Sequence, residues 1–225
     1  MSQQQANVFN DIIKSRHSVR GFQQQAVDNK LLTAIFTTAQ QSPSNCNTQP
    51  WQVFVASGER TNNLRHQLST AMMQGEMDMD FPFDGVYRDE YKLRQHEAAA
   101  QLYHAMGITR EDKAKRGEAF MRNFAFFDAP HVAFLYLHQD FGIREAADLG
   151  MYAQSLMLSM QANGVGSCPM TALSFHADKV RAELDVPEQY KLLFGIAFGY
   201  EDPDHPANGC RVERAPLEQV VHFRD

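Results

Sequence analysis

Cysteine is scarce in this sequence, and no part of it is long and apolar enough to cross a membrane. The three cysteines are widely spaced and form no Cys-x-x-Cys pair. This argues against a disulfide framework or a structural zinc site and favours a reducing, cytoplasmic setting. The longest uncharged helical stretch, residues 149–163, is too short for a span and contains polar side chains. The polar start, Met1-Ser-Gln-Gln-Gln, lacks the basic-then-apolar order of a signal peptide.

Basic residues are in the minority as well. The chain has 21 Lys and Arg against 27 Asp and Glu, a net charge of −6, so a general nucleic-acid surface is not expected. No GxGxxG follows a predicted strand, and neither a GxxxxGK[ST] phosphate loop nor a GxSxG elbow occurs. His96-Glu97 is not followed by a histidine at metalloprotease spacing, and we expect no metal site.

The hydrophobic pattern predicts a mixture of helices and strands. We expect helices near residues 8–15, 31–39, 59–74, 91–106, 112–126, 143–163 and 176–184, and strands at 51–57, 131–137 and 190–199. The tail, residues 217–223, is a candidate edge strand. Residues 75–90 contain glycine and proline and are expected to form a mobile loop.

The helix expected at Ile143–Asn163 has no charge in its last fifteen residues and apolar side chains on every face. A helix that is apolar all round is buried. Ala146 and Gly150, four residues apart, would allow another backbone to approach closely. Composition leaves two interpretations open: a central core helix within one chain, or a helix shared with a second subunit.

Two basic clusters stand out in this acidic chain. Residues 14–20 (KSRHSVR) contain three formal cations and a histidine but no carboxylate, and residues 208–214 (NGCRVER) again place arginine beside polar donors. Guanidinium groups offer a planar fork of donors suited to phosphate oxygens. Either cluster alone fits a solvated basic turn, whereas together they fit one dianionic ligand bound between the ends of the sequence.

Two further segments have the composition of ligand-binding loops. Residues 42–50 (SPSNCNTQP) supply many short donors and acceptors, which can line a polar heterocycle, or can form a surface loop of Asx turns. Residues 164–170 (GVGSCPM) form a glycine-rich turn that can approach a flat ligand with bare backbone. The plain alternative is a helix-to-strand connection.

Four of these segments together resemble the nitroreductase and flavin reductase family over nearly the whole chain. They are RHSVRGF (16–22), SPSNCNTQPW (42–51), NGVGSCPM (163–170) and NGCRVERAPLEQVV (208–221). Each is weak alone, but their order, with a strand directly after Gln-Pro-Trp, is specific. The middle of the chain, from GVYRDEYKLRQ to RNFAFFDAP, resembles the branch that includes nitrobenzoate reductases.

The resemblance implies one domain over residues 1–225 with a three-layer α+β fold, a central mixed β-sheet flanked by helices, and an interlocked homodimer. Two FMN molecules are expected at the subunit interface. The helix at 143–163 would belong to the dimer core. Residues 75–110 are longer than in compact members of the family and are expected to form a mobile insertion near the active site.

The same resemblance implies which residues contact FMN. Near the phosphate and ribityl chain it places Arg16, His17, Ser18 and Arg20, with Arg211 and Arg214 from the C-terminal segment. From the opposite subunit it brings Pro43, Ser44, Asn45 and Asn47, and beside the isoalloxazine ring it places Pro169, Met170 and Thr171. His17 stands where many members have arginine, and Thr171 and Ala172 stand where better-characterised members often have an acidic residue and a glycine.

The mechanism implied is ping-pong: NAD(P)H gives hydride to flavin N5 and leaves, and a small acceptor such as a nitroaromatic or quinone then takes electrons in the same pocket. The cofactor carries the chemistry, so no side chain is named as catalytic. Two alternatives remain on this fold: another flavin reaction, such as reductive dehalogenation or flavin breakdown, and a non-catalytic FMN-binding dimer.

Overall fold

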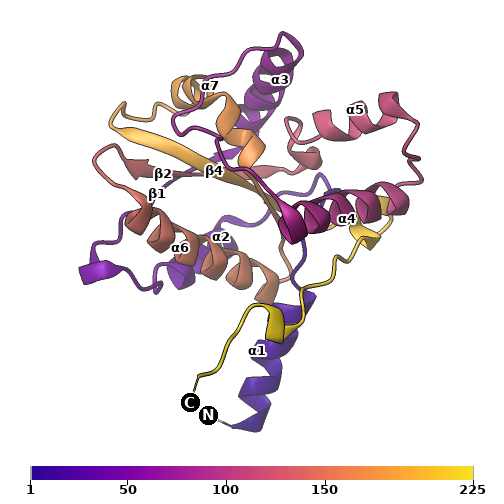
Figure 1. The fold of residues 1–225 in the computed structure, drawn as a ribbon. Coiled ribbons are helices and arrows are strands. Elements are labelled where there is room, and N and C mark those ends of the chain that lie inside the picture. Colours follow the sequence, from indigo (N-terminus) through magenta and orange to yellow (C-terminus); the bar gives the residue numbers. More distant parts are fainter. Residues whose placement is uncertain (1, 225) are drawn as a thin grey trace.

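The computed structural model describes residues 2–224, and its centre is a β-sheet between two layers of helices (Figure 1). Helices α2 (Asn29–Ala39) and α6 (Ile143–Ala162) cover one face of the sheet, and α3 (Glu59–Met73) and α7 (Ala177–Glu183) cover the other. The three-layer α+β architecture implied by the resemblance is confirmed.

The sheet contains β1 (Gln52–Ser57), β2 (His131–His138), β4 (Tyr190–Gly199) and β3 (Gly166–Met170), in that order. All three pairings between these strands are antiparallel, so the expectation of a mixed sheet is wrong for the strands of this chain. Each connection between consecutive strands is long or contains a helix, so the next strand can run in either direction. The sequence pattern therefore does not predict whether neighbouring strands are parallel or antiparallel.

Strand β2 separates two hydrophobic cores, because successive side chains of a strand point to opposite faces. Val132, Phe134 and Tyr136 pack toward α3 and α7. Ala133, Leu135 and Leu137 pack toward α2 and α6. Seven consecutive residues of β2 are buried, which accounts for the unbroken apolar run that predicted this strand.

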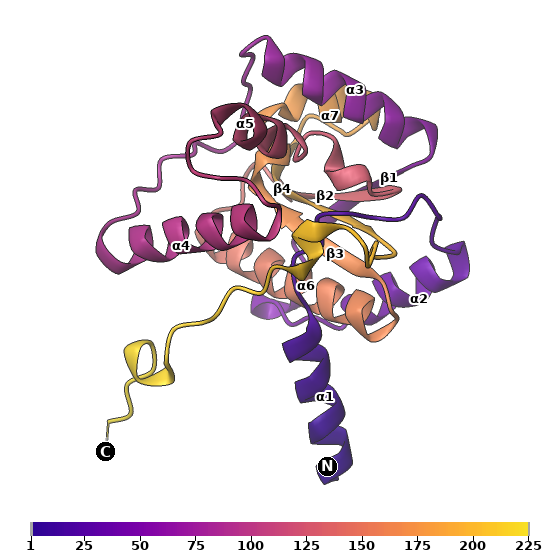
Figure 2. The same cartoon turned by 90° about the vertical axis from the view of Figure 1, so that its right-hand side faces the viewer.

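Two predictions about the edges of the sheet are wrong. The segment expected as a glycine-rich turn forms β3, which contains Pro169 and lies at the edge of the sheet, where a missing N–H is tolerated. The tail expected as an edge strand instead holds a short 3₁₀ turn, Leu217–Gln219. It runs away from the sheet (Figure 2) and pairs with no strand of its own chain.

Three helices lie outside the layers. α1 (Gln3–Ser15) projects from the body and buries none of its residues, and the C-terminal tail extends toward the same end of the molecule (Figure 2). α4 (Asp89–Ala105) and α5 (Lys113–Met121) form a hairpin on one side. Helix α5 ends at Met121, five residues before the expected end, and the chain continues in turns to Phe126, Phe127 and Asp128, which adopt positive φ.

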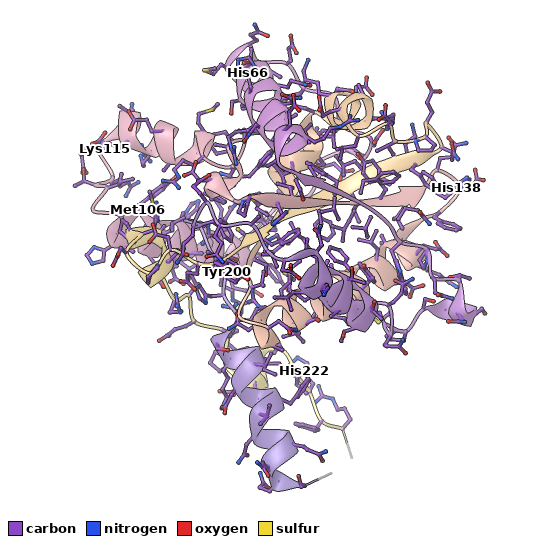
Figure 3. All side chains as sticks on the ribbon, turned by 180° about the vertical axis from the view of Figure 1, so that it is seen from behind. His66, Met106, Lys115, His138, Tyr200 and His222 are labelled. Atoms are coloured by element: carbon purple, nitrogen blue, oxygen red, sulfur yellow. The ribbon has the colours of Figure 1, made fainter. Side chains whose placement is uncertain are left out.

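Figure 3 shows the hairpin from behind, with Met106 and Lys115 on the side opposite His138 at the end of β2. Among residues 2–224, no helix combines the length and apolar character that a membrane span requires.

Candidate functional site

A cavity of about 690 Å³ lies where α1 meets the C-terminal segment. Its wall includes every residue of the two basic clusters that the resemblance assigned to the phosphate: Arg16, His17, Ser18, Arg20, Arg211 and Arg214. Ile13 and Lys14 of α1 and Gln154 of α6 complete one side. The structure thus brings together residues that are almost 200 positions apart in the sequence.

The first cluster is held by extended backbone after α1. Ser18 forms a parallel bridge with Ser167 of β3, and the Val19 N–H donates to the Ser167 carbonyl at 3.0 Å. Val19 is buried. Because side chains alternate along extended backbone, Ser18 and Arg20 on either side of Val19 face the cavity rather than the core.

Asn208 joins the two clusters through the hydrogen bonds of its side chain. Its carboxamide oxygen accepts from the Arg20 N–H at 2.7 Å, and its nitrogen donates to the Gly21 and Asp202 carbonyls, both at 2.8 Å. The side chain is buried and fully used. Gly21 allows His205, three residues before Asn208, to pack against its backbone, since a Cβ there would lie 2.2 Å from Cγ of His205.

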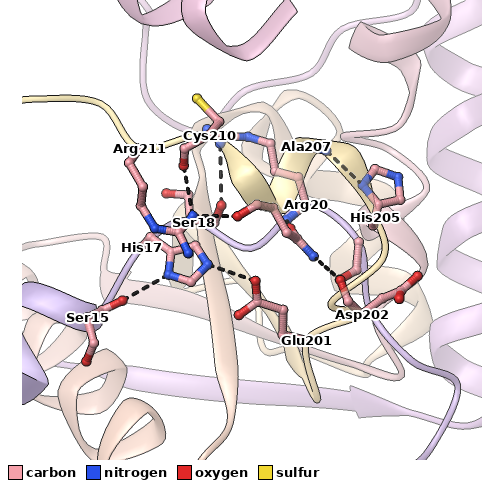
Figure 4. A network of polar contacts seen from close by, with 12 residues as sticks. Ser15, His17, Ser18, Arg20, Glu201, Asp202, His205, Ala207, Cys210 and Arg211 are labelled. Carbon is pink, nitrogen blue, oxygen red and sulfur yellow. Dashed lines mark hydrogen bonds and ion pairs between the residues drawn. The ribbon is translucent and has the colours of Figure 1, made fainter. Parts of the chain in front are cut away.

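Both ring nitrogens of His17 form hydrogen bonds. Nδ1 lies 2.9 Å from the Ser15 carbonyl oxygen and Nε2 lies 3.0 Å from Oε1 of Glu201 (Figure 4). Both partners are hydrogen-bond acceptors. The ring is therefore held in one orientation at the wall of the cavity, between Arg16 and Ser18 in the chain.

The guanidinium groups of the cavity have no carboxylate partner among residues 2–224. No ion pair involves Arg16, Arg20, Arg211 or Arg214, and the last two donate to backbone carbonyls of their own segment. Burial, and next the like charge of Arg214, lower the pKa of Arg16. An anion-binding site requires positive charge that neighbouring carboxylates do not neutralise.

Beneath the cluster lies Cys168, almost fully buried, and burial raises the pKa of its thiol to about 11. The thiol is therefore neutral at physiological pH and adds no negative charge beside the arginines. Within residues 2–224, no group of three or more His, Cys, Asp or Glu side chains could hold a metal ion.

The residues expected beside the flavin ring continue from the cavity along β3. Pro169 and Thr171 are exposed and Met170 is buried. Thr171 is four positions after Ser167, which pairs with Ser18, so the two lie roughly 13 Å apart at about 3.3 Å per residue. They do not line the cavity itself. They extend from it along the free edge of the sheet.

The loop of Pro43, Ser44, Asn45 and Asn47 lies elsewhere. Its Asn45 N–H donates to Oδ2 of Asp148 on α6 at 3.0 Å, while Gln161, thirteen residues further along α6, donates to Ser15 at the end of α1. The cavity reaches α6 at Gln154, six residues from Asp148 and roughly 9 Å along the helix at about 1.5 Å per residue. Within one chain, none of the four loop residues lines the basic cavity.

The loop is also under backbone strain. Cys46, Asn47 and Gln49 have φ of 50°, 56° and 47°, a region that side-chain-bearing residues adopt rarely. The Ser44 hydroxyl accepts from the Gln49 N–H at 2.9 Å and helps to hold this shape. Strained backbone that the surroundings maintain is common at functional sites.

The chain matches the model of the nitroreductase family over residues 13–200. It belongs to this family. It is 41% identical to nitroreductase NfnB of Mycolicibacterium smegmatis over 213 residues, covering 94% of this chain and 91% of the relative. It is 27% identical to a 4-nitrobenzoate reductase of Pseudomonas putida, covering 96% and 95%.

The crystal structure of the FMN-dependent nitroreductase NfnB from Mycobacterium smegmatis, in complex with NADPH, superposes on this nitroreductase-family chain with a TM-score of 0.94 at 40% identity, covering 98% of this chain and 100% of that one. The FMN and NADPH-dependent nitroreductase NfnB from Sphigopyxis sp. strain HMH superposes with a TM-score of 0.93 at 33% identity, covering 96% and 99%. The resemblance inferred from four motifs is thereby confirmed.

Sequence reasoning missed several residues of this nitroreductase site. Asn208 was read only as part of a basic segment, although it is the hydrogen-bonding link between the clusters. Gln154 and Cys210 also line the cavity, and Glu201 fixes His17. Only the placement of Asn208 before Gly209 gave a signal, and that dipeptide is equally typical of a plain turn.

Proposed function

We propose that this chain is an FMN-dependent nitroreductase that oxidises NADPH and reduces nitroaromatic compounds. The observation that carries the proposal is the cavity in which four arginines converge without a carboxylate partner in residues 2–224. The relatives that match nearly the whole chain are nitroreductases, and the two solved structures above are FMN-dependent and bind or use NADPH.

FMN fits the cavity by charge and by size. Its terminal phosphate is a dianion near neutral pH and accepts charge-assisted bonds worth roughly 1.5–3 kcal/mol each. We assign the phosphate and ribityl chain to Arg16, His17, Ser18 and Arg20, with Arg211 and Arg214 turning from their own carbonyls to the phosphate. A cavity of about 690 Å³ lies within the range of cofactor sites.

The flavin supplies the hydride and electron chemistry when it is bound. The chain's own residues bind and orient it: the basic cavity fixes the phosphate, and the free edge of β3 at Pro169, Met170 and Thr171 aligns the ring. We assign no acid–base side chain. Donor and acceptor would use the same pocket in turn, so NADP⁺ would leave before the acceptor enters.

We further propose that the enzyme is a homodimer whose flavin sites use both subunits. In the single chain, α1 exposes Val8 and Phe9, each 55% exposed, and the tail exposes Phe223, 79% exposed. On α6, Ala147, Gly150, Met151 and Gln154 form an exposed stripe at helical spacing. Exposed apolar side chains on α1, α6 and the tail favour an interface. A second copy would cover it.

The dimer also resolves the separation of the loop at 43–47 from the basic cavity. Both groups belong to one flavin site if the loop comes from the opposite subunit, as its contact with Asp148 on α6, beside the exposed stripe, permits. The three cysteines form no disulfide, which supports a cytoplasmic enzyme as part of this proposal.

In this proposal residues 75–110 are a mobile part of the single domain and form the side of the pocket that binds the acceptor. Of the three aromatic residues in the loop at 75–90, Phe81 packs against the hydrophobic core between the sheet and helices α2 and α6. Phe83 lies edge-to-face with Phe175, with ring centroids 6.2 Å apart. Tyr87 is 52% exposed and is the ring that we assign to an aromatic acceptor.

Steady-state kinetics test the proposal. Purified protein is expected to be yellow, to release FMN and not FAD on denaturation, and to oxidise NADPH with a nitroaromatic acceptor. Double-reciprocal plots at several acceptor concentrations should be parallel. Intersecting lines would contradict alternating use of one face, and FAD in the supernatant would contradict the assignment of the basic cavity.

A further inference from the structure

The segment that we assign to the acceptor, residues 75–110, is attached to the body of the molecule close to its start. Asp78 forms a parallel bridge with His176. Its N–H donates to the Phe175 carbonyl at 2.8 Å, and its own carbonyl accepts from the Ala177 N–H at 2.9 Å. The backbone at the start of the segment is therefore fixed against the beginning of α7.

Two residues later, the side chain of Asp80 makes a second attachment. Nη2 of Arg181 on α7 donates to both of its carboxylate oxygens, at 2.9 and 2.8 Å, and Nζ of Lys191 lies 3.6 Å from Oδ1. The Leu192 N–H donates to Oδ2 at 2.7 Å. Only 10% of the Asp80 side chain and 13% of the Arg181 side chain are exposed. Because a nearly buried charge is costly without its partner, this ion pair holds Asp80 in one place between α7 and β4.

The attachment lies close to the position that we assign to the flavin ring along β3. Strand β3 ends where Met170 pairs with Gly195, whereas β4 begins further back in the chain. Leu192 is three positions before Gly195, roughly 10 Å along β4 at about 3.3 Å per residue. Asp80 therefore binds β4 just beyond the end of β3, in the direction in which Met170 leads to Thr171.

The aromatic rings that follow Asp80 belong to the same region. Phe83 lies edge-to-face with Phe175, the last residue of the 3₁₀ turn that starts at Thr171. Tyr87, seven positions after Asp80, is the exposed ring that we assign to the acceptor. The chain that carries Tyr87 thus starts from a fixed point near the flavin position, and its path depends on where Asp80 is held.

We propose that Asp80 and Arg181 form a positioning pair that sets the KM of the enzyme for its aromatic acceptor. The ion pair holds the start of the acceptor segment so that Tyr87 covers the acceptor, while neither charged side chain touches flavin or acceptor. Neither residue lines the basic cavity, so FMN binding does not depend on the pair. This inference rests on the proposed function, because acceptor reduction is its second half-reaction. Loss of binding that the ground state and the transition state share raises KM and leaves kcat unchanged.

Steady-state kinetics with NADPH and nitrobenzene test the pair. Asp80→Asn should raise the KM for nitrobenzene at least fivefold and leave kcat, FMN content and the rate of flavin reduction by NADPH within twofold. Ferricyanide, an acceptor without an aromatic ring, should keep its native KM. Glu183→Gln is the matched control, because this carboxylate on α7 is also 13% exposed and binds α7 to α3 through Asn63 and Gln67. Its KM for nitrobenzene should stay native.

Hydrogen exchange gives a second readout that does not depend on activity. Exchange of residues 78–88, followed by mass spectrometry, should be faster in Asp80→Asn and native in Glu183→Gln. The double variant Asp80→Asn/Arg181→Gln removes both charges of the pair and so avoids an unpaired buried charge. It should show the same rise in KM and replaces the single variant if Asp80→Asn does not fold.

A nitrobenzene KM within twofold of native in the folded variant would overturn the proposal. An equal rise for ferricyanide, or an equal rise in Glu183→Gln, would overturn it as well. If the native enzyme oxidises NADPH with neither acceptor, the proposed function fails instead, and the exchange result still decides whether the pair holds the segment.

Discussion

The carboxamide oxygen of Asn208 accepts a 2.7 Å hydrogen bond from the backbone N–H of Arg20, across 188 residues of sequence. This bond, with the two that Asn208 donates to Gly21 and Asp202, aligns the C-terminal arginines with those after α1. A backbone link of this kind fixes the separation of the guanidinium groups without using any of their own donors. Those donors remain available to a phosphate.

Replacing Asn208 by alanine should weaken FMN binding about tenfold and destabilise the fold by about 2–4 kcal/mol, because three polar groups that are buried or partly buried lose their partner. Fluorescence titration of the apoprotein with FMN and urea unfolding give the two quantities. Asn163→Ala is the control: it loses one bond, to the Ser159 carbonyl, away from the cavity. Its FMN affinity should stay native, and an equal loss of affinity in both variants would contradict a positioning role for Asn208.

The Arg16→Ala variant should change FMN affinity without lowering the stability of the apoprotein. Burial and the nearby Arg214 disfavour the charged form of Arg16 in the empty protein, so its removal should leave the apoprotein equally stable or more stable. The same change should weaken FMN binding at least tenfold, since a charge-assisted bond is lost. Thermal unfolding with and without FMN measures both effects. Arg144→Ala, an exposed arginine outside the cavity, should alter neither, and a destabilised Arg16→Ala apoprotein would contradict the account.

His131 predicts a dependence of stability on pH. It is buried, its Nε2 accepts from the Val27 N–H at 2.9 Å, and burial lowers its pKa. Below an ordinary value of about 6.5 the unfolded chain therefore binds more protons than the folded protein. Stability should be complete above that pH and should fall as pH falls toward the folded pKa.

Urea unfolding at pH 7.5 and pH 5.5 measures this loss. His131→Gln, which keeps an acceptor for Val27, should show a shallower fall, while a residual slope remains from His176 and His205, whose pKa values burial also lowers. His222→Gln, exposed in the tail, should keep the native slope. A His131→Gln variant with the full native slope would show that another group is responsible.

Shared flavin sites predict complementation between subunits. Arg20→Ala and Asn45→Ala/Asn47→Ala chains should each be inactive as homodimers. In a mixed dimer one site collects all the defects and the other none, so activity should recover toward half of the native value. Absence of recovery in dimers verified by native mass spectrometry would contradict sharing, and a monomer at micromolar concentration would end the dimer proposal.

The sequence predicted most helices and strands because their apolar spacing is regular, as in β2 and α6. It failed where tertiary contacts decide. Strand β3 contains Gly166 and Pro169, which locally favour a turn, yet pairing with β4 and the edge position make it a strand. The tail has the apolar content of a strand but no partner edge in its own chain.

The candidate site, like the fold, was predictable only in part from the sequence. Charge contrast singled out Arg16, Arg20, Arg211 and Arg214, and the structure places all four in one cavity. Asn208 and Glu201 were not predictable, since a neutral amide and a lone carboxylate carry no local signal. Their positions become meaningful only when residues 15–21 and 201–208 lie side by side.

Rapid mixing of the purified enzyme with NADPH under anaerobic conditions tests the central claim most directly. The account predicts that the absorbance of oxidised flavin bleaches in a single turnover and returns when a nitroaromatic is added. Phe83→Leu/Tyr87→Leu should raise the acceptor KM and leave the bleaching nearly unchanged. Flavin that stays oxidised with both NADPH and NADH would contradict the reductase assignment.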